Sequence, residues 1–234
     1  MKIEGSVVLV TGANRGIGLE MTRNALAKGH RVIAVCRNPS AATDLAALQA
    51  AHGASCHIAQ ADVCDAAALD AIANAVDGAI DVVVCNAGAM SARGGVADTG
   101  NTAEAIGSVL MTNMVGPFFT ARAFFTPLSR SSQPRIAIIS SYMGSQQHTG
   151  SGAYFYRASK AGANNLMVTL TNELRDQGIA VAAYHPGWVQ TDMGGASADL
   201  TPQESATALL ARFEALDMAH TGCFINYDGT PLPL

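Results

Sequence analysis

The feature that most constrains the fold of this chain is a repeated alternation of short apolar runs with longer segments of helical period. The runs are rich in Val, Ile and Ala and are apolar on both faces, as expected for parallel strands covered by helices on each side. They span residues 6–11, 31–36, 55–60, 81–86, 135–140, 179–184 and 223–226. The helical segments lie near residues 17–28, 40–51, 65–77, 102–128, 154–177 and 203–218. Six alternations predict a doubly wound α/β fold, with a seven-stranded parallel sheet between two helical layers.

Length and continuity predict a single domain. The chain has 234 residues, of which 49% are hydrophobic and 14% charged, so a sizeable core can form. No linker, internal repeat or low-complexity segment divides it. The longest glycine-rich break, residues 86–101, falls inside the alternating pattern. We therefore expect one domain over residues 1–234.

Charge and cysteine content argue against several classes of partner. The net charge is −4 and the 14 Lys and Arg residues form no basic run, which is unlike a nucleic-acid binder. The five cysteines lack CxxC spacing, so we expect no metal site and interpret them as small core residues in a reducing compartment. The chain shows no signal-peptide pattern and no apolar run of transmembrane length, so we expect a cytoplasmic protein without a membrane partner.

The first predicted strand runs directly into the sequence TGANRGIG, residues 11–18, and then into a helix. Gly12, Gly16 and Gly18 suit a turn in which the backbone approaches a ligand closely and packs tightly on the start of the helix. The N–H groups of that helix would face a pyrophosphate. Because the turn lies at the first strand–helix junction, it predicts a dinucleotide site; a purely structural turn is the alternative.

The end of the second predicted strand indicates which dinucleotide binds. An acidic residue there would bind a ribose 2′-hydroxyl, whereas an arginine accommodates a 2′-phosphate. The chain has Cys36 and then Arg37, with no carboxylate before Asp44, and Arg15 in the glycine turn could reach the same phosphate. NADP(H) is therefore favoured over NAD(H), and two solvated arginines are the alternative.

The stretch YFYRASK, residues 154–160, contains a candidate acid–base pair. Tyr156 and Lys160 are four residues apart in a helical segment, so their side chains share a face, whereas Tyr154 has Ala158 at that offset. An ammonium beside a phenol stabilises the phenolate and would lower the pKa of Tyr156 toward the working range. On its own, this spacing more often has only a structural meaning.

Taken together, the motifs resemble those of the short-chain dehydrogenase/reductase family over nearly the whole chain and in the family's order. They are TGANRGIG at 11–18, NAG at 86–88, Asn113, SSYMG at 140–144, YRASK at 156–160 and PGWVQT at 186–191. The resemblance implies a Rossmann-type fold and an NAD(P)-dependent oxidoreductase whose catalytic residues are Asn113, Ser141, Tyr156 and Lys160. Ser141 is preferred to Ser140 because two residues and a glycine follow it, as in the family. The interval from Ser141 to Tyr156 is longer by about two residues than is common.

The implied chemistry is hydride transfer from the nicotinamide to a carbonyl carbon. Tyr156 would donate its proton to the carbonyl oxygen, and the Ser141 hydroxyl would orient that oxygen. Lys160 would tune Tyr156 and hold the nicotinamide ribose. In the family, the asparagine that corresponds to Asn113 binds a water linking the lysine to solvent; a helix-surface amide is the alternative.

The same resemblance assigns the remaining cofactor contacts. Asp62 and Val63 would contact adenine, and the Val189 backbone amide would fix the nicotinamide. The full predicted cofactor set is Gly12, Asn14, Arg15, Gly16, Ile17, Gly18, Arg37, Asp62, Val63, Asn86, Ala87, Gly88, Tyr156, Lys160, Pro186, Gly187, Val189 and Thr191. His185, which precedes Pro186, is expected to pack at the end of a strand rather than act as a base.

The loops predict an apolar carbonyl or alcohol substrate, because Arg93 is their only cation. The side chains expected to face it are Met90, Tyr142, Met143, Trp188 and Met193. The segment PGWVQTDMGG and the C-terminal segment FINYDGTPLPL resemble those of the carbonyl reductase subgroup that includes C-factor-like and sniffer-like proteins. This favours NADPH-dependent reduction of a ketone or aldehyde. A dinucleotide-binding signalling protein and an NAD-linked alcohol oxidant are the alternatives.

The predicted helices 102–128 and 154–177 carry more aromatic and aliphatic side chains than one layer over the sheet requires. Those expected to face away from the sheet are Phe118, Phe119, Phe124, Phe125 and Leu166. Because the family commonly pairs these two helices, we expect a homodimer or homotetramer.

Overall fold

The computed structural model describes residues 5–234 and contains one seven-stranded parallel sheet with the strand order β3-β2-β1-β4-β5-β6-β7. The strands are β1 (Val7–Thr11), β2 (Arg31–Cys36), β3 (Cys56–Gln60), β4 (Val82–Cys85), β5 (Arg135–Ile139), β6 (Ala180–His185) and β7 (Phe224–Asn226). The predicted doubly wound fold is confirmed, and every strand end lies within one residue of its expected position.

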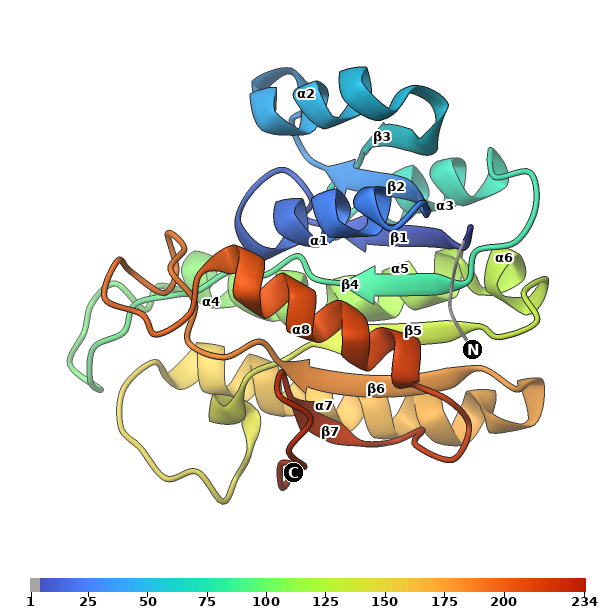
Figure 1. Ribbon diagram of the computed structural model, residues 1–234. Coiled ribbons are helices and arrows are strands. Elements are labelled where there is room, and N and C mark those ends of the chain that lie inside the picture. The colour runs from blue at the N-terminus through green and yellow to red at the C-terminus, as the bar shows by residue number, and fades with distance from the viewer. Residues whose placement is uncertain (1–4) are drawn as a thin grey trace.

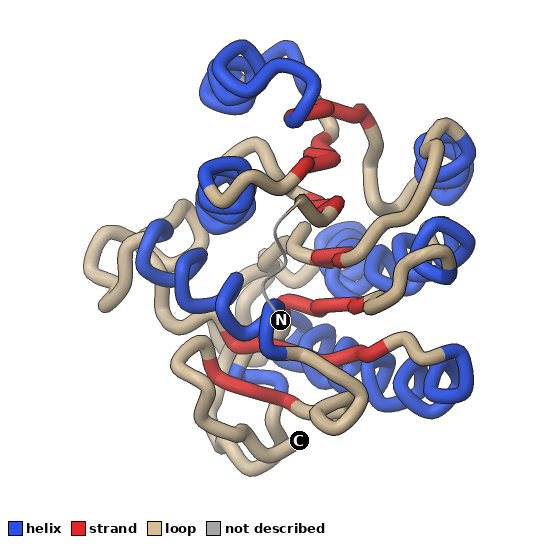
Figure 2. Tube along the Cα trace, turned by 45° about the vertical axis from the view of Figure 1, so that its right-hand side comes forward, coloured by secondary structure: helices blue, strands red, loops and turns tan. Residues whose placement is uncertain are grey.

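Helices cover both faces of this sheet (Figures 1 and 2). On one face lie α1 (Gly16–Ala27), α2 (Thr43–His52) and α8 (Pro202–Ala215). On the other lie α3 (Ala66–Asn74), α5 (Gly116–Ala123), α6 (Phe125–Ser129) and α7 (Tyr154–Leu174), with α4 (Ala103–Leu110) packed beside α7. Within residues 5–234, no helix has both the length and the apolar character needed to cross a membrane.

Each face of the sheet has its own core, which explains why the strands are apolar throughout. In β1, Val8 and Val10 pack with α1, α2 and α8, whereas Val7 and Leu9 pack with α3, α5, α6 and α7. Successive side chains of a strand point to opposite faces, so a strand buried on both sides needs an apolar residue at every position.

The carboxyl ends of all seven strands lie along one edge of the sheet, at the left in Figure 1. The chain leaves β1 toward β2 and β3 on one side, and β4 continues the sheet on the other side of β1. Ligands of open α/β sheets bind at such a reversal of strand order, outside the carboxyl ends. The loops after β1, β4, β5 and β6 meet there and carry most of the predicted site residues.

The single helix predicted over residues 102–128 is wrong. The segment contains α4, a π-helical turn (Met111–Val115), α5 and α6. Pro117 provides the reason, because it has no N–H to donate to the carbonyl of Asn113, four residues earlier, and its ring would clash with that carbonyl. The Gly116 amide instead bonds to the Met111 carbonyl, five residues back. Such π turns are frequent at functional sites.

The prediction that five apolar side chains face away from the sheet and support self-association is partly wrong. Phe124 is fully buried in the core, and Phe119 and Leu166 pack against that core. Phe118 and Phe125 are exposed. Pairing of two chains through α5, α6 and α7 stays a prediction, now resting on a smaller apolar surface.

Candidate active site

The glycine turn after β1 is built so that only glycine fits. Gly12 and Gly16 have φ angles of 66° and 54°, in the left-handed region that other residues rarely adopt. A Cβ at Gly12 would lie 3.0 Å from the Cα of Ala87, and a Cβ at Gly18 would collide with the Gly12 carbonyl oxygen. The turn therefore brings the start of α1 directly against the end of β4.

Asn86 fastens the glycine turn to β4. Its side-chain amide donates to the carbonyls of Thr11 (2.9 Å) and Gly12 (3.3 Å). In return, the Thr11 hydroxyl accepts from the backbone N–H groups of Asn86 (3.0 Å) and Ala87 (3.1 Å). From the sequence, Asn86 is expected to contact the cofactor only. In the structure, its side chain holds the two loops together at the point where the strand order reverses.

The N-terminus of α1 has backbone donors that no side chain caps. Arg15 is the N-cap residue and makes no side-chain capping bond, so the amides of the first turn remain available to an anion. The Arg15 guanidinium instead forms an ion pair with Asp192, in the loop after β6. The Thr191 methyl group of the same loop faces Gly16, 3.2 Å from where a Cβ would be.

The structure brings Arg37 and Asp62 together at the end of β2 and β3. The guanidinium lies 3.9 Å from the Asp62 carboxylate; the Arg37 side chain is largely exposed and the Asp62 side chain is partly buried. The other carboxylate oxygen of Asp62 accepts from the Cys64 amide at 2.9 Å. Val63 is buried and packs against Gly116. This corner thus holds an exposed cation beside a fixed carboxylate, at the place predicted for the adenosine end of the cofactor.

Tyr156 and Lys160 lie on the buried face of α7, with 8% and 4% of their surfaces exposed. The Lys160 ammonium is 5.7 Å from the centre of the Tyr156 ring and donates to the Ile139 carbonyl at 2.8 Å. The Ser141 hydroxyl lies close enough to the phenol to oppose the rise in its pKa. The neighbouring Ser140 hydroxyl points elsewhere and donates to the Asn164 side chain at 2.6 Å. The geometry therefore places Ser141, rather than Ser140, at the phenol.

Asn113 lies within the π turn and is buried, with three hydrogen bonds. Its amide donates to the Ala89 carbonyl (2.8 Å) and to the Ser159 hydroxyl (2.9 Å), and its carbonyl oxygen accepts from the Ala89 N–H (2.8 Å). A Cβ at Gly88 would lie 3.6 Å from that carbonyl oxygen and 3.9 Å from the Lys160 nitrogen. Asn113 and Lys160 thus face the same small space above Gly88.

The predicted lowering of the Tyr156 pKa is wrong for this structure. Burial of the phenol raises its pKa, and the opposing effects of the Ser141 hydrogen bond and the Arg93 charge are smaller. Burial also lowers the pKa of Lys160 from 10.5 to about 8. The nearby ammonium therefore does not outweigh the loss of water around the phenol.

The loop after β6 closes the site from the side of α8. The Pro186 carbonyl accepts from the Ser205 hydroxyl of α8 at 2.7 Å, and Gly187 has a φ of 84°. Val189 is buried and pairs with Leu200. Together with the Thr191 contact to Gly16, these anchors hold the predicted nicotinamide loop over the ends of β1 and β6.

Tyr142 and Trp188 supply exposed aromatic surface beside this loop, with 42% and 48% of their surfaces accessible. Tyr142 lies between the rings of His148 and His185, at centroid distances of 5.2 and 5.0 Å. Burial lowers the pKa of His185 to about 4, so its imidazole is neutral near pH 7. His185 packs at the end of β6, as predicted.

Comparison with known proteins agrees with this geometry. The sequence profile described as short chain dehydrogenase matches residues 6–201. The chain belongs to that family. Among curated relatives, the C-signal protein of Myxococcus xanthus is 35% identical over 161 residues, covering 68% of this chain and 96% of that protein. An uncharacterized oxidoreductase of Schizosaccharomyces pombe is 31% identical over the full length of both chains.

Two solved structures are similar along nearly the whole chain. The carbonyl reductase Sniffer of D. melanogaster superposes with a TM-score of 0.92 at 30% identity, covering 99% of this chain and 100% of that one. The NADPH-bound carbonyl reductase from chicken fatty liver gives a TM-score of 0.91 at 32% identity, with the same coverage. The chain is therefore an oxidoreductase of the short-chain dehydrogenase type, a family that binds a nicotinamide dinucleotide.

The carboxyl edge of the sheet fits such a dinucleotide. The uncapped first turn of α1 suits a pyrophosphate, the glycine turn leaves room for close approach, and the buried Lys160 offers donors to hydroxyl groups. The contribution of Ser159 and the ion pair of Arg15 with Asp192 were not predicted from the sequence. These depend on long-range contacts that no local pattern encodes, although the Gly116-Pro117 pair inside a helical segment could have revealed the π turn at Asn113.

Proposed function

We propose that this protein reduces a ketone or aldehyde to the alcohol by hydride transfer from NADPH. The observation that carries the proposal is the convergence of the Tyr156 phenol, the Ser141 hydroxyl and the buried Lys160 ammonium at the carboxyl edge of the sheet. These three groups are a proton donor, a hydrogen-bond donor and a cation, which carbonyl reduction requires where charge develops on the oxygen.

The bound cofactor supplies the hydride, and the side chains manage the proton and the developing charge. Tyr156 gives its proton to the carbonyl oxygen, while the Ser141 hydroxyl donates a hydrogen bond to that oxygen. Lys160 would hold the ribose hydroxyls and keep a positive charge near the phenolate that forms. Asn113 is fixed by Ala89 and Ser159 beside Gly88, on the same side as the Lys160 nitrogen.

The protonation state of Tyr156 suits a proton donor. Because burial raises its pKa, the phenol keeps its proton near pH 7 and can act as an acid.

NADPH is proposed over NADH because Arg37 stands exposed where the second strand ends. Asp62, the carboxylate nearest to it, is already engaged by the Cys64 amide. A guanidinium at this position is suited to a 2′-phosphate. The solved carbonyl reductase of chicken fatty liver, similar in fold and 32% identical, is bound to NADPH.

The substrate is proposed to be largely apolar. Tyr142 and Trp188 expose aromatic surface beside Ser141 and the loop after β6, and both can cover an aromatic or aliphatic group. Three of the similar structures are described as carbonyl reductases, which supports a carbonyl group in the substrate.

A panel of aromatic and aliphatic ketones and aldehydes, offered to the purified protein with NADPH, tests the proposal. We expect loss of NADPH absorbance with several members and formation of the matching alcohols. Tight NADPH binding without turnover of any member would contradict it. That outcome would support the second candidate, a dinucleotide-binding signalling protein, which the 35% identity to the C-signal protein favours.

A further inference from the structure

Arg93, in the loop between β4 and α4, contacts two separate segments, the start of α7 and the loop after Thr191. Its backbone carbonyl accepts from the Ala153 N–H at 3.1 Å. Its guanidinium donates to the carbonyl of Met193, in the loop after Thr191. One residue thereby connects the start of α7 with the loop that covers the predicted nicotinamide position.

The contact with Ala153 lies at a strained point of the backbone. Ala153 is the N-cap of α7 and, within residues 5–234, the one non-glycine residue with a positive φ, 45°. Gly152 also has a positive φ, 75°, and a Cβ there would come 2.5 Å from the Arg93 carbonyl oxygen. A residue in this conformation persists only when its surroundings hold it. The Arg93 carbonyl is part of that support, because it accepts the Ala153 N–H. Ala153 lies three residues before Tyr156.

The charge of Arg93 is not neutralised by the protein. Within residues 5–234, no carboxylate lies within ion-pair distance of its guanidinium. Asp98, in the same loop, accepts from the amides of Gly94 and Gly100, both at 2.9 Å. Arg93 is exposed, so water screens part of its charge, and what remains opposes the rise in the Tyr156 pKa that burial causes.

We propose that Arg93 is a positioning residue for the proton donor: it ties the start of α7 to the loop after Thr191 and sets a positive charge beside the Tyr156 phenol. The inference rests on the proposed function, in which Tyr156 carries the proton. The other charged and titratable groups near the phenol are Lys160 of α7 and Tyr142 of the turn after β5, with His148 and His185 packed on Tyr142.

The variant Arg93→Gln separates charge from structure. Glutamine keeps a donor for the Met193 carbonyl and leaves the backbone bond to Ala153 unchanged, but it has no charge. The matched control is Arg157→Gln. Arg157 also donates to a backbone carbonyl, that of His148, and directly follows Tyr156, yet its charge is not among the influences on the phenol. Arg93→Lys should restore the charge.

Titration of the tyrosinate absorbance reads the effect without any substrate. The chain has five tyrosines, so subtracting the curve of the Tyr156→Phe protein isolates the phenol in question. We expect Arg93→Gln to raise the pKa of Tyr156, and Arg93→Lys and Arg157→Gln to leave it near the wild-type value. In kinetics, the alkaline limb of kcat/KM for reduction should move to higher pH, and alcohol oxidation near pH 7 should fall several-fold.

An unchanged phenol titration in Arg93→Gln would overturn the inference, as would an equal shift in Arg157→Gln or the same loss in Arg93→Lys. A wild-type protein that reduces no carbonyl, yet shows the titration shift in Arg93→Gln, would refute the proposed function alone and leave the electrostatic role of Arg93 in place.

Discussion

Two buried cations lie at opposite ends of the same strand, and their surroundings differ. Arg135 begins β5 with 6% of its surface exposed, whereas Lys160 of α7 reaches the carbonyl of Ile139, the last residue of β5, with 4% exposed. Burial lowers the pKa of both groups. Each cation pays a desolvation cost, so each needs a reason to be retained.

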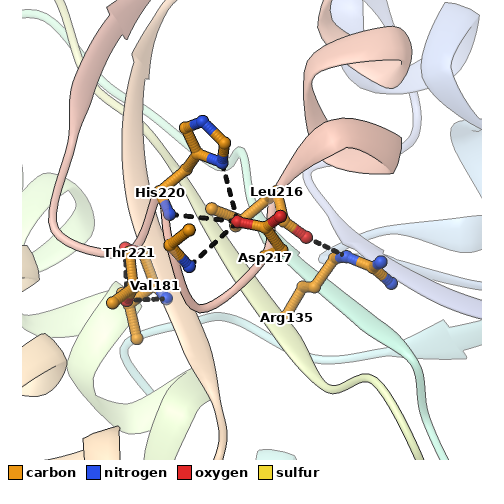
Figure 3. Close-up of polar contacts among 7 residues, drawn as sticks. Arg135, Val181, Leu216, Asp217, His220 and Thr221 are labelled. Atoms are coloured by element: carbon orange, nitrogen blue, oxygen red, sulfur yellow. Dashed lines mark hydrogen bonds and ion pairs between the residues drawn. The ribbon is translucent and has the colours of Figure 1, made fainter.

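Arg135 is satisfied by the protein. Its guanidinium donates to the carbonyls of Leu216 (2.6 Å) and Gln133 (3.1 Å) and to the Gln133 side chain (3.0 Å). Figure 3 shows the contact with Leu216 next to the turn in which Asp217 accepts from His220, with Thr221 bonded to Val181 nearby. This end of the sheet is a hydrogen-bonded structural junction between β5 and the segment after α8.

Lys160 is not satisfied in this way. Its ammonium can donate three hydrogen bonds, and within residues 5–234 one acceptor, the Ile139 carbonyl, is paired with it. The nitrogen lies 3.9 Å from where a Cβ of Gly88 would be. A buried cation with donors left over is typical of a site that binds a ligand. We therefore propose a structural role for Arg135 and a functional role for Lys160.

The largest expected effect is that of Lys160→Met. We expect turnover to fall by at least about a hundredfold and NADPH binding to weaken, because the charge and the ribose contact are both lost. The folded protein should nevertheless be at least as stable near pH 7, since an uncompensated buried charge is removed. Thermal unfolding without cofactor checks the predicted stability, and kinetics with NADPH check the predicted losses of turnover and cofactor affinity. A destabilised variant with normal cofactor affinity would show that Lys160 is structural.

The wild type and Lys160→Met also test how the free energy of unfolding depends on pH. The pKa of Lys160 is about 8 when folded and 10.5 ordinarily, so the unfolded chain binds this proton more strongly between those values. The free energy of unfolding of the wild type should therefore rise with pH from about 8 to 10.5, relative to Lys160→Met. Below pH 8 the difference between the two proteins should be constant.

Arg135→Met should show the opposite pattern. Removing the guanidinium leaves the carbonyls of Leu216 and Gln133 without this donor, and a lost partner of a buried group typically costs about 1–3 kcal/mol. We expect the free energy of unfolding to fall by that amount, with kcat and KM of the folded enzyme unchanged. Urea unfolding monitored by circular dichroism measures the first quantity. A fully folded Arg135→Met protein with reduced specific activity would contradict a purely structural role for Arg135.

In contrast to the two buried cations, Arg37 is exposed, and we expect it to determine the preference for NADPH over NADH. Arg37→Ala should weaken NADPH binding about ten- to hundredfold, the range of a charge-assisted pair with phosphate, and leave NADH almost untouched. The Cys36→Asp substitution should go further and reverse the preference, because it repels the phosphate and offers the ribose an acceptor. Kinetics with both cofactors decide the matter. Equal losses for NADPH and NADH in Arg37→Ala would make the arginine structural.

Asp192→Asn should have the smallest effect. Its ion pair with Arg15 is largely exposed, and such pairs contribute about 0–1 kcal/mol. If Arg15 serves the cofactor phosphate, releasing it from Asp192 should tighten NADPH binding by no more than about fivefold. Titration calorimetry can resolve that change. Weaker NADPH binding in Asp192→Asn would show that the pair instead helps to close the loop.

The pattern of residues predicted the sheet almost completely, because strands buried on both faces must be apolar at every position, as in β1. It also predicted the proximity of Tyr156 and Lys160, since helical spacing alone brings them together. The direction of the Tyr156 pKa shift was not predictable, because it depends on how deeply the fold buries the phenol. The same holds for Asn86, whose partners Thr11, at the end of β1, and Gly12 lie 75 and 74 residues earlier in the chain.

Single-turnover reduction by Tyr156→Phe tests the central claim most directly. The substrate is the best ketone found in the panel, at saturating NADPH, and Tyr154→Phe is the control because that side chain is exposed on the same helix. We predict that the rate falls at least about a hundredfold in Tyr156→Phe. NADPH affinity should stay near the wild-type value, and Tyr154→Phe should react normally. A Tyr156→Phe protein that keeps most of its single-turnover rate would contradict the claim that this phenol donates the proton.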